Sequence, residues 1–139
     1  YVERTTLDDL FAQSDVVSLH TPLNAETRGM VGSRLFDAMR PGSFLVNTSR
    51  GAVVDVDAAL AAVDRGTLAG LALDVLPAEP VARDSRLLGH PRVILTPHAA
   101  FFSVESEKEL RRKAAQNLAT WLSTGRPDYV VTPGTRRPA

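Results

Sequence analysis

The sequence predicts an α/β protein built on a parallel β-sheet, and three observations lead to this fold class. First, four short apolar runs bounded by turn residues have the length and composition of buried strands. Second, amphipathic segments of helical period alternate with these runs, which is the pattern of βαβ units. Third, a long amphipathic segment, Ser103 to Thr124, follows the last run and predicts a C-terminal helix. The four predicted strands occupy residues 15–20, 43–48, 68–75 and 93–96.

Three shorter helices are predicted by their ends as well as by their apolar stripes. Thr6 is a suitable N-cap for a helix that runs to Gln13, because two acidic residues lie in its first turn. The stripe from Met30 to Met39 is followed by a Pro-Gly pair, which ends a helix. The segment from Asp55 to Arg65 is rich in alanine and is stopped by a glycine.

The long C-terminal helix is expected to have an apolar stripe and a charged face, and to end at Gly125. Its run of charged residues is typical of a solvated helix face. Trp121 is a candidate for an exposed apolar patch, although packing into an ordinary core explains it equally well. The stripe consists of Leu110, Ala114, Leu118, Trp121 and Leu122.

The composition is that of an ordinary globular protein. The chain has 139 residues, 44% of them hydrophobic, and one globular domain is the default for this length. Zero net charge and the lack of a basic run argue against nucleic acid as a partner. No apolar stretch is long enough to span a bilayer and no signal peptide opens the chain, so no membrane partner is expected. The absence of cysteine excludes disulfides and thiolate catalysis and fits a cytoplasmic protein, and no metal site is expected. The proline- and arginine-rich tail, 132–139, is expected to fray.

Three polar residues, Arg50, Glu79 and His98, each follow one of three successive predicted strands. Parallel strands end on the same side of a sheet, where α/β proteins bind ligands, so these side chains are expected to converge on one pocket. A carboxylate beside a histidine favours the charged imidazole and fixes its tautomer, which is how a general acid/base is built. The planar guanidinium of arginine suits a carboxylate or a carbonyl oxygen. The three residues therefore predict a site that binds a small acid and moves a proton.

The same crevice is where sheets of this kind bind dinucleotides, which would provide a hydride carrier. Each of the three residues also has a structural interpretation. Arg50 could cap a loop, and Glu79, which precedes a proline, could belong to ordinary turn chemistry. His98, in a Thr-Pro-His sequence, could be a loop residue without a catalytic part.

Three further polar residues are less specific. Asp74, at the end of a predicted strand, could simply cap a loop. His20 ends a strand near a proline and is expected to be structural or close to a cofactor. His90 lies in a Gly-His-Pro turn and is expected to be solvated.

Several segments together resemble one known family in their residues, order and spacing. They are Ser14–Leu23, Glu26–Arg28, Arg40–Gly51, Ala72–Val75, Glu79–Pro80 and Thr96–His98. The sequence is similar over nearly its whole length to the D-isomer-specific 2-hydroxyacid dehydrogenases, the family of D-3-phosphoglycerate dehydrogenase. A branch of that family comprises the corepressors called C-terminal-binding proteins. The segment from His98 to Ser103 resembles that branch, in which an aromatic residue follows His-Ala-Ala.

The resemblance implies a role for each matching residue. Arg50 matches the substrate-binding and catalytic arginine, His98 matches the acid/base, and Glu79 matches its carboxylate partner. Asp74 matches an aspartate near the nicotinamide carboxamide of NAD, and NADP is not excluded as the cofactor. The positions that match cofactor-binding segments are His20, Thr21, Pro22, Thr27, Thr48, Ser49, Arg50, Asp74, His98 and Ala100.

One departure from the family pattern is large. The chain has no G-x-G-x-x-G turn, and the resemblance implies that this phosphate-binding turn and most of a substrate domain lie before Tyr1. The expected fold is then a partial Rossmann-like, doubly wound parallel sheet that lacks its first βαβ unit and carries a long C-terminal helix. Residues 1–102 would be the C-terminal part of an NAD-binding domain. Residues 103–139 would be a helix and tail returning towards the substrate domain.

The strand order of this fold gives a further expectation. In a sheet ordered 3-2-1-4-5-6, we assign the strand at 15–20 as the third strand, whose neighbour would be the missing second strand. The three later strands would be the fourth to sixth and would pair together. The strand at 15–20 is therefore expected to expose an edge instead of pairing with the strand at 43–48.

Three functions are compatible with these residues. The first is hydride exchange between a nicotinamide cofactor and a small D-2-hydroxy acid, or its 2-keto acid, by a whole protein that is a homodimer. The second is a corepressor-like interaction protein that senses NAD. The third is an inactive fragment. The chain by itself is expected to be inactive and to bind NAD weakly, because it lacks the backbone amides that cradle the pyrophosphate.

Overall fold

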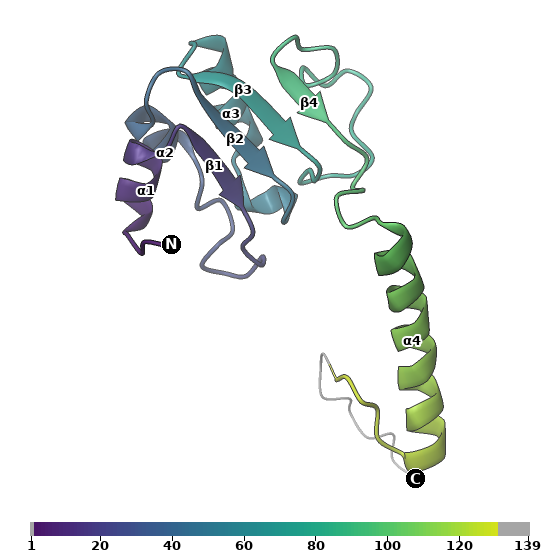
Figure 1. The fold of residues 1–139 in the computed structure, drawn as a ribbon. Helices are drawn as coiled ribbons and strands as arrows, with labels where there is room; N and C mark the ends of the chain where they lie inside the picture. The colour runs from purple at the N-terminus through teal and green to yellow at the C-terminus, as the bar shows by residue number, and fades with distance from the viewer. Residues whose placement is uncertain (1, 131–139) are drawn as a thin grey trace. The chain divides into compact units, whose positions relative to one another are not determined.

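A computed structural model describes residues 2–130 and shows a four-stranded parallel sheet (Figure 1). The strands lie in the order β1-β2-β3-β4, so each pairs with its neighbour in sequence. Contacts divide the chain into two compact units, residues 1–100 and 101–139, and the sheet belongs to the first. The strands are β1 (Val16–Leu19), β2 (Ser43–Asn47), β3 (Leu68–Leu73) and β4 (Val93–Leu95).

Two of the helices of the first unit begin where their caps predict. In α1 (Leu7–Gln13), the Thr6 hydroxyl accepts a hydrogen bond from the Asp9 N–H at 3.1 Å. In α3 (Val56–Asp64), the carboxylate of Asp55 does the same for the Ala58 N–H at 3.0 Å. Both are side-chain N-caps, which stabilise a helix because its first N–H groups have no partner within the helix.

Helix α2 (Ser33–Ala38) is shorter than the segment Met30–Met39 that the apolar stripe predicts. The prediction is wrong at its start because Val31 is extended and forms a parallel bridge with Val54. Its N–H donates to the Val53 carbonyl at 3.1 Å, and its own carbonyl accepts the Asp55 N–H at 2.9 Å. A buried valine used in a bridge gives the same apolar signal as a buried valine in a helix.

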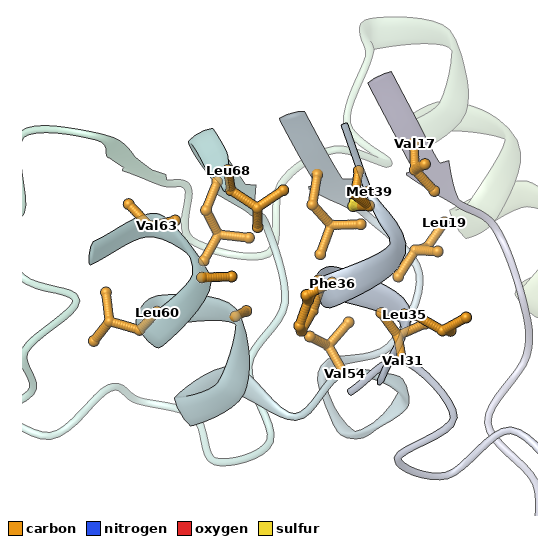
Figure 2. Close-up of a cluster of buried hydrophobic side chains, with 14 of the residues drawn as sticks. Val17, Leu19, Val31, Leu35, Phe36, Met39, Val54, Leu60, Val63 and Leu68 are labelled. Carbon is orange, nitrogen blue, oxygen red and sulfur yellow. The ribbon is translucent and has the colours of Figure 1, made fainter. Parts of the chain in front are cut away.

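One face of the sheet is covered by α1, α2 and α3, and the hydrophobic core lies between these helices and the sheet (Figure 2). Strand β2 shows the arrangement, because Leu45 is fully buried while Phe44 on the opposite face is 46% exposed. Side chains alternate between faces along a strand, so each strand contributes every second residue to the core. Core residues from strands and helices include Val17, Leu19, Leu35, Phe36, Leu45, Leu60, Val63, Leu68 and Leu71.

The opposite face of the sheet is open and apolar within the described residues. Val16, Phe44 and Ile94 are between 46% and 66% exposed on it. The sequence predicts strands that are buried on both faces, and the structure shows burial on one face only. Parallel sheets are usually covered on both faces, so the apolar residues of this open face are those of a sheet that takes a second layer.

The prediction that the strand at 15–20 does not pair with the strand at 43–48 is wrong. Strand β1 pairs in parallel with β2, from Val16–Phe44 to Leu19–Asn47. In the order 3-2-1-4-5-6 the third strand lies at the far edge and never touches the fourth. A strand that pairs with the next one in sequence fits the fourth position instead. Strand β1 therefore corresponds to the fourth strand of that order and not to the third. Strand β1 keeps an unpaired edge on its other side among residues 2–130.

The second unit contains one long helix, α4 (Val104–Thr124), which agrees closely with the prediction. It starts with a capping box in which the Ser103 and Ser106 side chains bond each other's backbone N–H groups. It ends at Gly125, whose φ of 73° is left-handed. Within this unit the apolar stripe is exposed, and Trp121 is 51% accessible, so it belongs to an exposed patch and not to a core. Predictions for the tail after residue 130 lie outside the described residues.

None of the helices in the described part of the chain combines the length and the apolar character needed to cross a bilayer.

Candidate functional site

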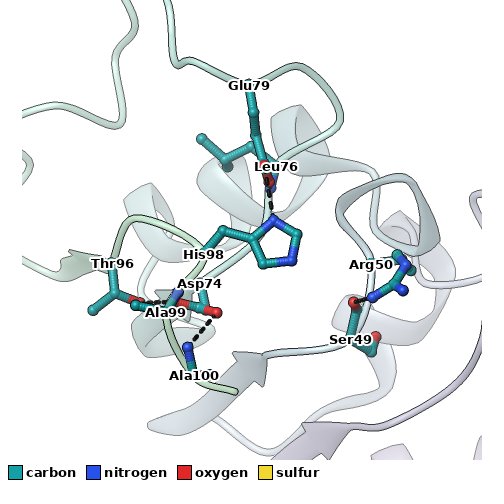
Figure 3. Close-up of polar contacts among 9 residues, drawn as sticks. All are labelled: Ser49, Arg50, Asp74, Leu76, Glu79, Thr96, His98, Ala99 and Ala100. Carbon is teal, nitrogen blue, oxygen red and sulfur yellow. Dashed lines mark hydrogen bonds and ion pairs between the residues drawn. The ribbon is translucent and has the colours of Figure 1, made fainter. Parts of the chain in front are cut away.

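Arg50, Glu79 and His98 follow β2, β3 and β4 at the carboxyl edge of the sheet and line one cavity of about 240 Å³ (Figure 3). The convergence expected from parallel strands is therefore present in the geometry. In Figure 3 the imidazole of His98 lies between the Glu79 carboxylate and Arg50. Leu23, Gly51, Ala52, Val75, Leu76 and Pro77 complete the lining.

The Glu79 carboxylate joins His98 to the backbone of its own loop. Its Oε2 lies 2.8 Å from Nδ1 of His98, and its Oε1 accepts the Leu76 N–H at 2.8 Å. The hydrogen bond from His98 is the main reason that the pKa of Glu79 lies below its usual value, and the bond from the Leu76 N–H is the second. Partial burial acts in the opposite direction but is outweighed. An ionised carboxylate only accepts, so Nδ1 of His98 carries the hydrogen of this bond. In Figure 3 the other ring nitrogen, Nε2, lies on the side of the ring turned away from Glu79 and towards Arg50.

Asp74 is 6% exposed and holds the loop that presents His98. One carboxylate oxygen accepts the Thr96 hydroxyl and the Ala99 N–H, the latter at 2.8 Å, and the other accepts the Ala100 N–H at 2.9 Å. Burial raises the pKa of this carboxyl, but the three hydrogen bonds outweigh it and leave the pKa below its usual value. Of the two interpretations from the sequence, the observed contacts are those of a loop cap.

The loop held by Asp74 has an unusual backbone at His98. Its φ is 55°, and His98 is the one residue other than glycine with a positive φ in the described part of the chain. Such a conformation is uncommon for residues with a Cβ and persists where the surroundings enforce it. The Asp74 carboxylate accepts the N–H groups of the two residues that follow His98, and these bonds fix the turn that aims the imidazole.

The loop that carries Arg50 is folded by a fully buried residue, Asn47, which sequence reasoning missed. Its Oδ1 accepts the N–H and the hydroxyl of Ser49 at 3.0 and 2.9 Å, and its Nδ2 donates to the Arg50 carbonyl oxygen at 3.0 Å. The guanidinium of Arg50 donates to the Ser49 carbonyl at 2.7 Å and is otherwise exposed. A polar residue ending an apolar strand was the available signal, because a buried amide needs partners in an adjacent loop.

A second, more polar cavity of about 450 Å³ opens beside Arg50 at the ends of β1 and β2. Six of the ten predicted cofactor-binding residues line it, namely His20, Thr21, Pro22, Thr48, Ser49 and Arg50, together with Leu23. Thr27 does not line it. Its hydroxyl donates to the Pro22 carbonyl at 2.6 Å and accepts the Asn24 N–H, so it braces the loop. His20 bonds the Ser18 hydroxyl at 2.8 Å.

Of the remaining predicted cofactor residues, Asp74, His98 and Ala100, the last donates its N–H to the first. Asp74 and His98 border a third cavity of about 410 Å³, which is mostly apolar. Leu76, Glu79 and His98 line both this apolar cavity and the one shared with Arg50. The apolar lining of the 410 Å³ cavity comes from Leu76, Pro80, Val81, Leu88, Leu95 and Pro97.

His90 is not the solvated turn residue that the sequence predicts. Its side chain is only 15% exposed, with Nε2 at 3.2 Å from the Asp64 carboxylate and Nδ1 accepting the Arg92 N–H. The bond from His90 is the main reason that the pKa of Asp64 lies below its usual value. The pair ties the end of α3 to the turn before β4. Within residues 2–130, the structure contains no group of three or more side chains suited to a metal ion.

Comparisons with known proteins identify the family of this chain. Residues 1–100 match the family described as D-isomer specific 2-hydroxyacid dehydrogenase, NAD binding domain. A glyoxylate reductase of Korarchaeum cryptofilum is 44% identical over 94% of this chain, which corresponds to 39% of the relative. The D-3-phosphoglycerate dehydrogenase of Escherichia coli K12 is 40% identical over 86% of this chain and 30% of the relative.

A solved structure carries the same fold. The D-lactate dehydrogenase of Lactobacillus jensenii, crystallised with NAD+, superposes with a TM-score of 0.81 at 28% identity, over 93% of this chain and 43% of that one. The chain spans 30–39% of the length of the two curated relatives. Its sequence, its parallel sheet and its matched residues place it in the D-isomer specific 2-hydroxyacid dehydrogenase family, in the part that corresponds to the NAD-binding domain.

Proposed function

We propose that the whole protein exchanges a hydride between NAD or NADP and a small D-2-hydroxy acid, or the corresponding 2-keto acid. The observation that carries this proposal is the cavity in which a glutamate-bound imidazole faces a guanidinium. The first group suits proton transfer and the second suits a carboxylate. The relatives named above are a reductase and dehydrogenases, which favours an enzyme over a corepressor-like protein.

Arg50 is proposed to bind the carboxylate of the substrate. The bond from its guanidinium to the Ser49 carbonyl orients the side chain at the border of two cavities. A planar guanidinium gives a carboxylate two parallel hydrogen bonds, which fixes the orientation as well as the position of a small acid. The neighbouring carbonyl oxygen of a 2-keto acid would then lie towards His98.

His98 is proposed to exchange the proton of the C2 oxygen. With its Nδ1 hydrogen bonded to Glu79, the ring can present a protonated or a free Nε2 to the cavity. A protonated Nε2 would donate to the carbonyl oxygen during reduction, and a neutral Nε2 would accept the hydroxyl proton during oxidation. The Glu79 carboxylate would stabilise the imidazolium and hold one tautomer, much as a buried carboxylate does in other acid/base pairs.

The polar cavity beside Arg50 is proposed to hold the nicotinamide end of the cofactor. Its hydroxyl and imidazole side chains suit a ring that carries a carboxamide, and its place at the carboxyl ends of β1 and β2 is where such sheets bind dinucleotides. The bound cofactor would supply or accept the hydride. Thr48 and Ser49 would hydrogen bond it, whereas Asp74 would act indirectly through the His98 loop.

Arg50→Ala in the whole protein tests the substrate assignment. We expect kcat/KM for 2-keto acids such as glyoxylate, with NADH or NADPH, to fall by about 100-fold, because the carboxylate loses its charged partner. The assay follows absorbance of the reduced cofactor. Arg65→Ala is a matched control, since Arg65 pairs with Asp37 at the end of α3, away from the cavities. Equal activity of the Arg50→Ala and wild-type proteins would refute the assignment.

The 139-residue chain by itself is expected to bind NADH weakly. The glycine-rich turn whose backbone amides cradle a pyrophosphate is not among its residues, and the polar cavity offers contacts for one end of the cofactor only. Titration calorimetry with NADH should give a dissociation constant above about 1 mM, which corresponds to about 4 kcal/mol of binding free energy. Tight, stoichiometric binding would show that the chain holds the pyrophosphate in another way.

Assembly and location are further parts of the proposal. We infer a homodimer, because the open sheet face and the exposed stripe of α4 leave apolar surface for other parts of the protein or a second subunit. The lack of cysteine supports a cytoplasmic location, and zero net charge supports small acids in preference to nucleic acid as ligands. We retain residues 1–102 as the proposed extent of the NAD-binding part and 103–139 as the returning segment.

A further inference from the structure

Gly51 is buried and lies directly against the main chain of the loop that carries Glu79. A Cβ added at this position would lie 2.0 Å from the carbonyl carbon of Leu76, 2.3 Å from its oxygen and 2.4 Å from the nitrogen of Pro77. These are backbone atoms, which cannot turn aside as the end of a flexible side chain can. The φ of Gly51 lies outside the left-handed region, so the glycine is required by space and not by conformation.

The two sides of this contact carry the two halves of the site. On one side, Gly51 directly follows Arg50, whose carbonyl is held by the buried Asn47 at 3.0 Å. On the other side, the Leu76 N–H donates to Glu79 at 2.8 Å. The same carboxylate bonds the His98 imidazole, also at 2.8 Å. A single contact between main chains therefore links the guanidinium loop to the carboxylate–imidazole pair.

We propose that Gly51 is a positioning residue that sets the spacing between Arg50 and the Glu79–His98 pair. The absent side chain lets the loops after β2 and β3 approach to backbone contact. A methyl group at residue 51 would push Leu76 away and would move the N–H that holds Glu79. The catalytic meaning of this spacing rests on the proposed function, whereas the contact itself does not.

Amide hydrogen exchange of the Gly51→Ala chain tests the contact without any need for catalysis. We expect the Leu76 amide to exchange at least about tenfold faster than in the wild-type chain, because its bond to Glu79 is displaced. Gly32→Ala is the matched control. A Cβ at Gly32 would find its nearest neighbour, the Cβ of Asp55, at 3.9 Å, and the φ of −137° suits alanine. Leu76 exchange in this control should equal that of the wild type.

Kinetics of the whole protein test the consequence for the site. We expect Gly51→Ala to lower kcat/KM for 2-keto acids by about tenfold or more with the KM for the cofactor unchanged, since small displacements of reacting groups are costly. The double variant Gly51→Ala with Glu79→Gln should lose little more than Glu79→Gln alone, because both act on the same carboxylate. If Gly51→Ala does not fold, adding Pro77→Gly frees the facing backbone and permits the same measurements.

The outcomes separate the inference from the function it serves. Wild-type Leu76 exchange in a folded Gly51→Ala variant, or unchanged kcat/KM in an active protein, would overturn the positioning role. Faster Leu76 exchange in Gly51→Ala together with no turnover by the wild-type protein would support the contact and refute the proposed function. Faster exchange together with the kinetic loss supports both.

Discussion

Replacing His98 with glutamine is expected to lower kcat for 2-keto acid reduction by about 10³-fold, within the range that general acid–base catalysis contributes. Glutamine can still hydrogen bond the Glu79 carboxylate, which pairs with His98 at 2.8 Å in the native site. It cannot carry the second, transferable proton that an imidazole presents from Nε2. Single-turnover measurements of cofactor oxidation would report the chemical step separately from product release.

His90→Gln is the matched control for this experiment. His90 also pairs with a carboxylate, that of Asp64, but none of the cavities described above is lined by it. Its replacement is expected to lower thermal stability and to leave kcat within about twofold, as for a substitution that acts on folding alone. A His98→Gln enzyme as active as the His90→Gln enzyme would show that the proton comes from elsewhere.

Replacing Asp74 with alanine is expected to damage both stability and activity. The change leaves the Ala99 and Ala100 N–H groups and the Thr96 hydroxyl without the acceptor they share. Losing the partner of partly buried donors costs about 1–3 kcal/mol, so urea unfolding should show a loss of about 2 kcal/mol. The freed loop no longer enforces the left-handed backbone of His98, and kcat/KM should fall by about 10²- to 10³-fold.

Asp64→Ala distinguishes these two effects. It removes a carboxylate that bonds His90 and Arg86, so it should lower stability while kcat/KM stays near that of the wild type. If both variants lose activity in proportion to stability, Asp74 has no specific effect on the site. Asn at position 74 keeps one acceptor oxygen, so Asp74→Asn should be intermediate in both measurements.

Acid unfolding provides a further readout for Asp74. Its pKa is lower in the folded chain than in the unfolded chain, so the unfolded chain binds the proton more readily. The stability gained from this difference is present above about pH 4 and is lost as the pH falls below it. The Asp74→Ala variant should therefore lose less stability than the wild type between neutral pH and about pH 3.

The local elements of this fold were predictable because their signals lie close together in sequence. Thr6, Asp55 and Ser103 cap their helices as their residue types indicate. The apolar runs also mark all four strands to within about two residues. The partner of the strand at 15–20 was not predictable from such signals, because an apolar run records burial and not the identity of the neighbouring strand. The order 3-2-1-4-5-6 does not by itself say which position the first apolar run of a chain occupies.

The candidate site was predictable in part for a related reason. Arg50, Glu79 and His98 follow strands of one parallel sheet, so topology alone brings them to one edge. Of the residues that hold them in place, Asn47 and Gly51 were missed. Asn47 folds the loop that directly follows it, whereas Gly51 lies against the backbone of Leu76 and Pro77. The three donors to Asp74 come from residues more than 20 positions away. Such contacts depend on loop geometry, which residue spacing does not specify.

The left-handed backbone of His98 also has a consequence for the balance between folding stability and activity in this protein. A residue with a Cβ in that region costs about 1 kcal/mol relative to glycine, so the site spends folding free energy to aim its imidazole. Thermostabilising screens scored on folding alone would favour glycine at position 98 and would discard the proton donor. Selection for turnover must therefore accompany any engineering of this loop.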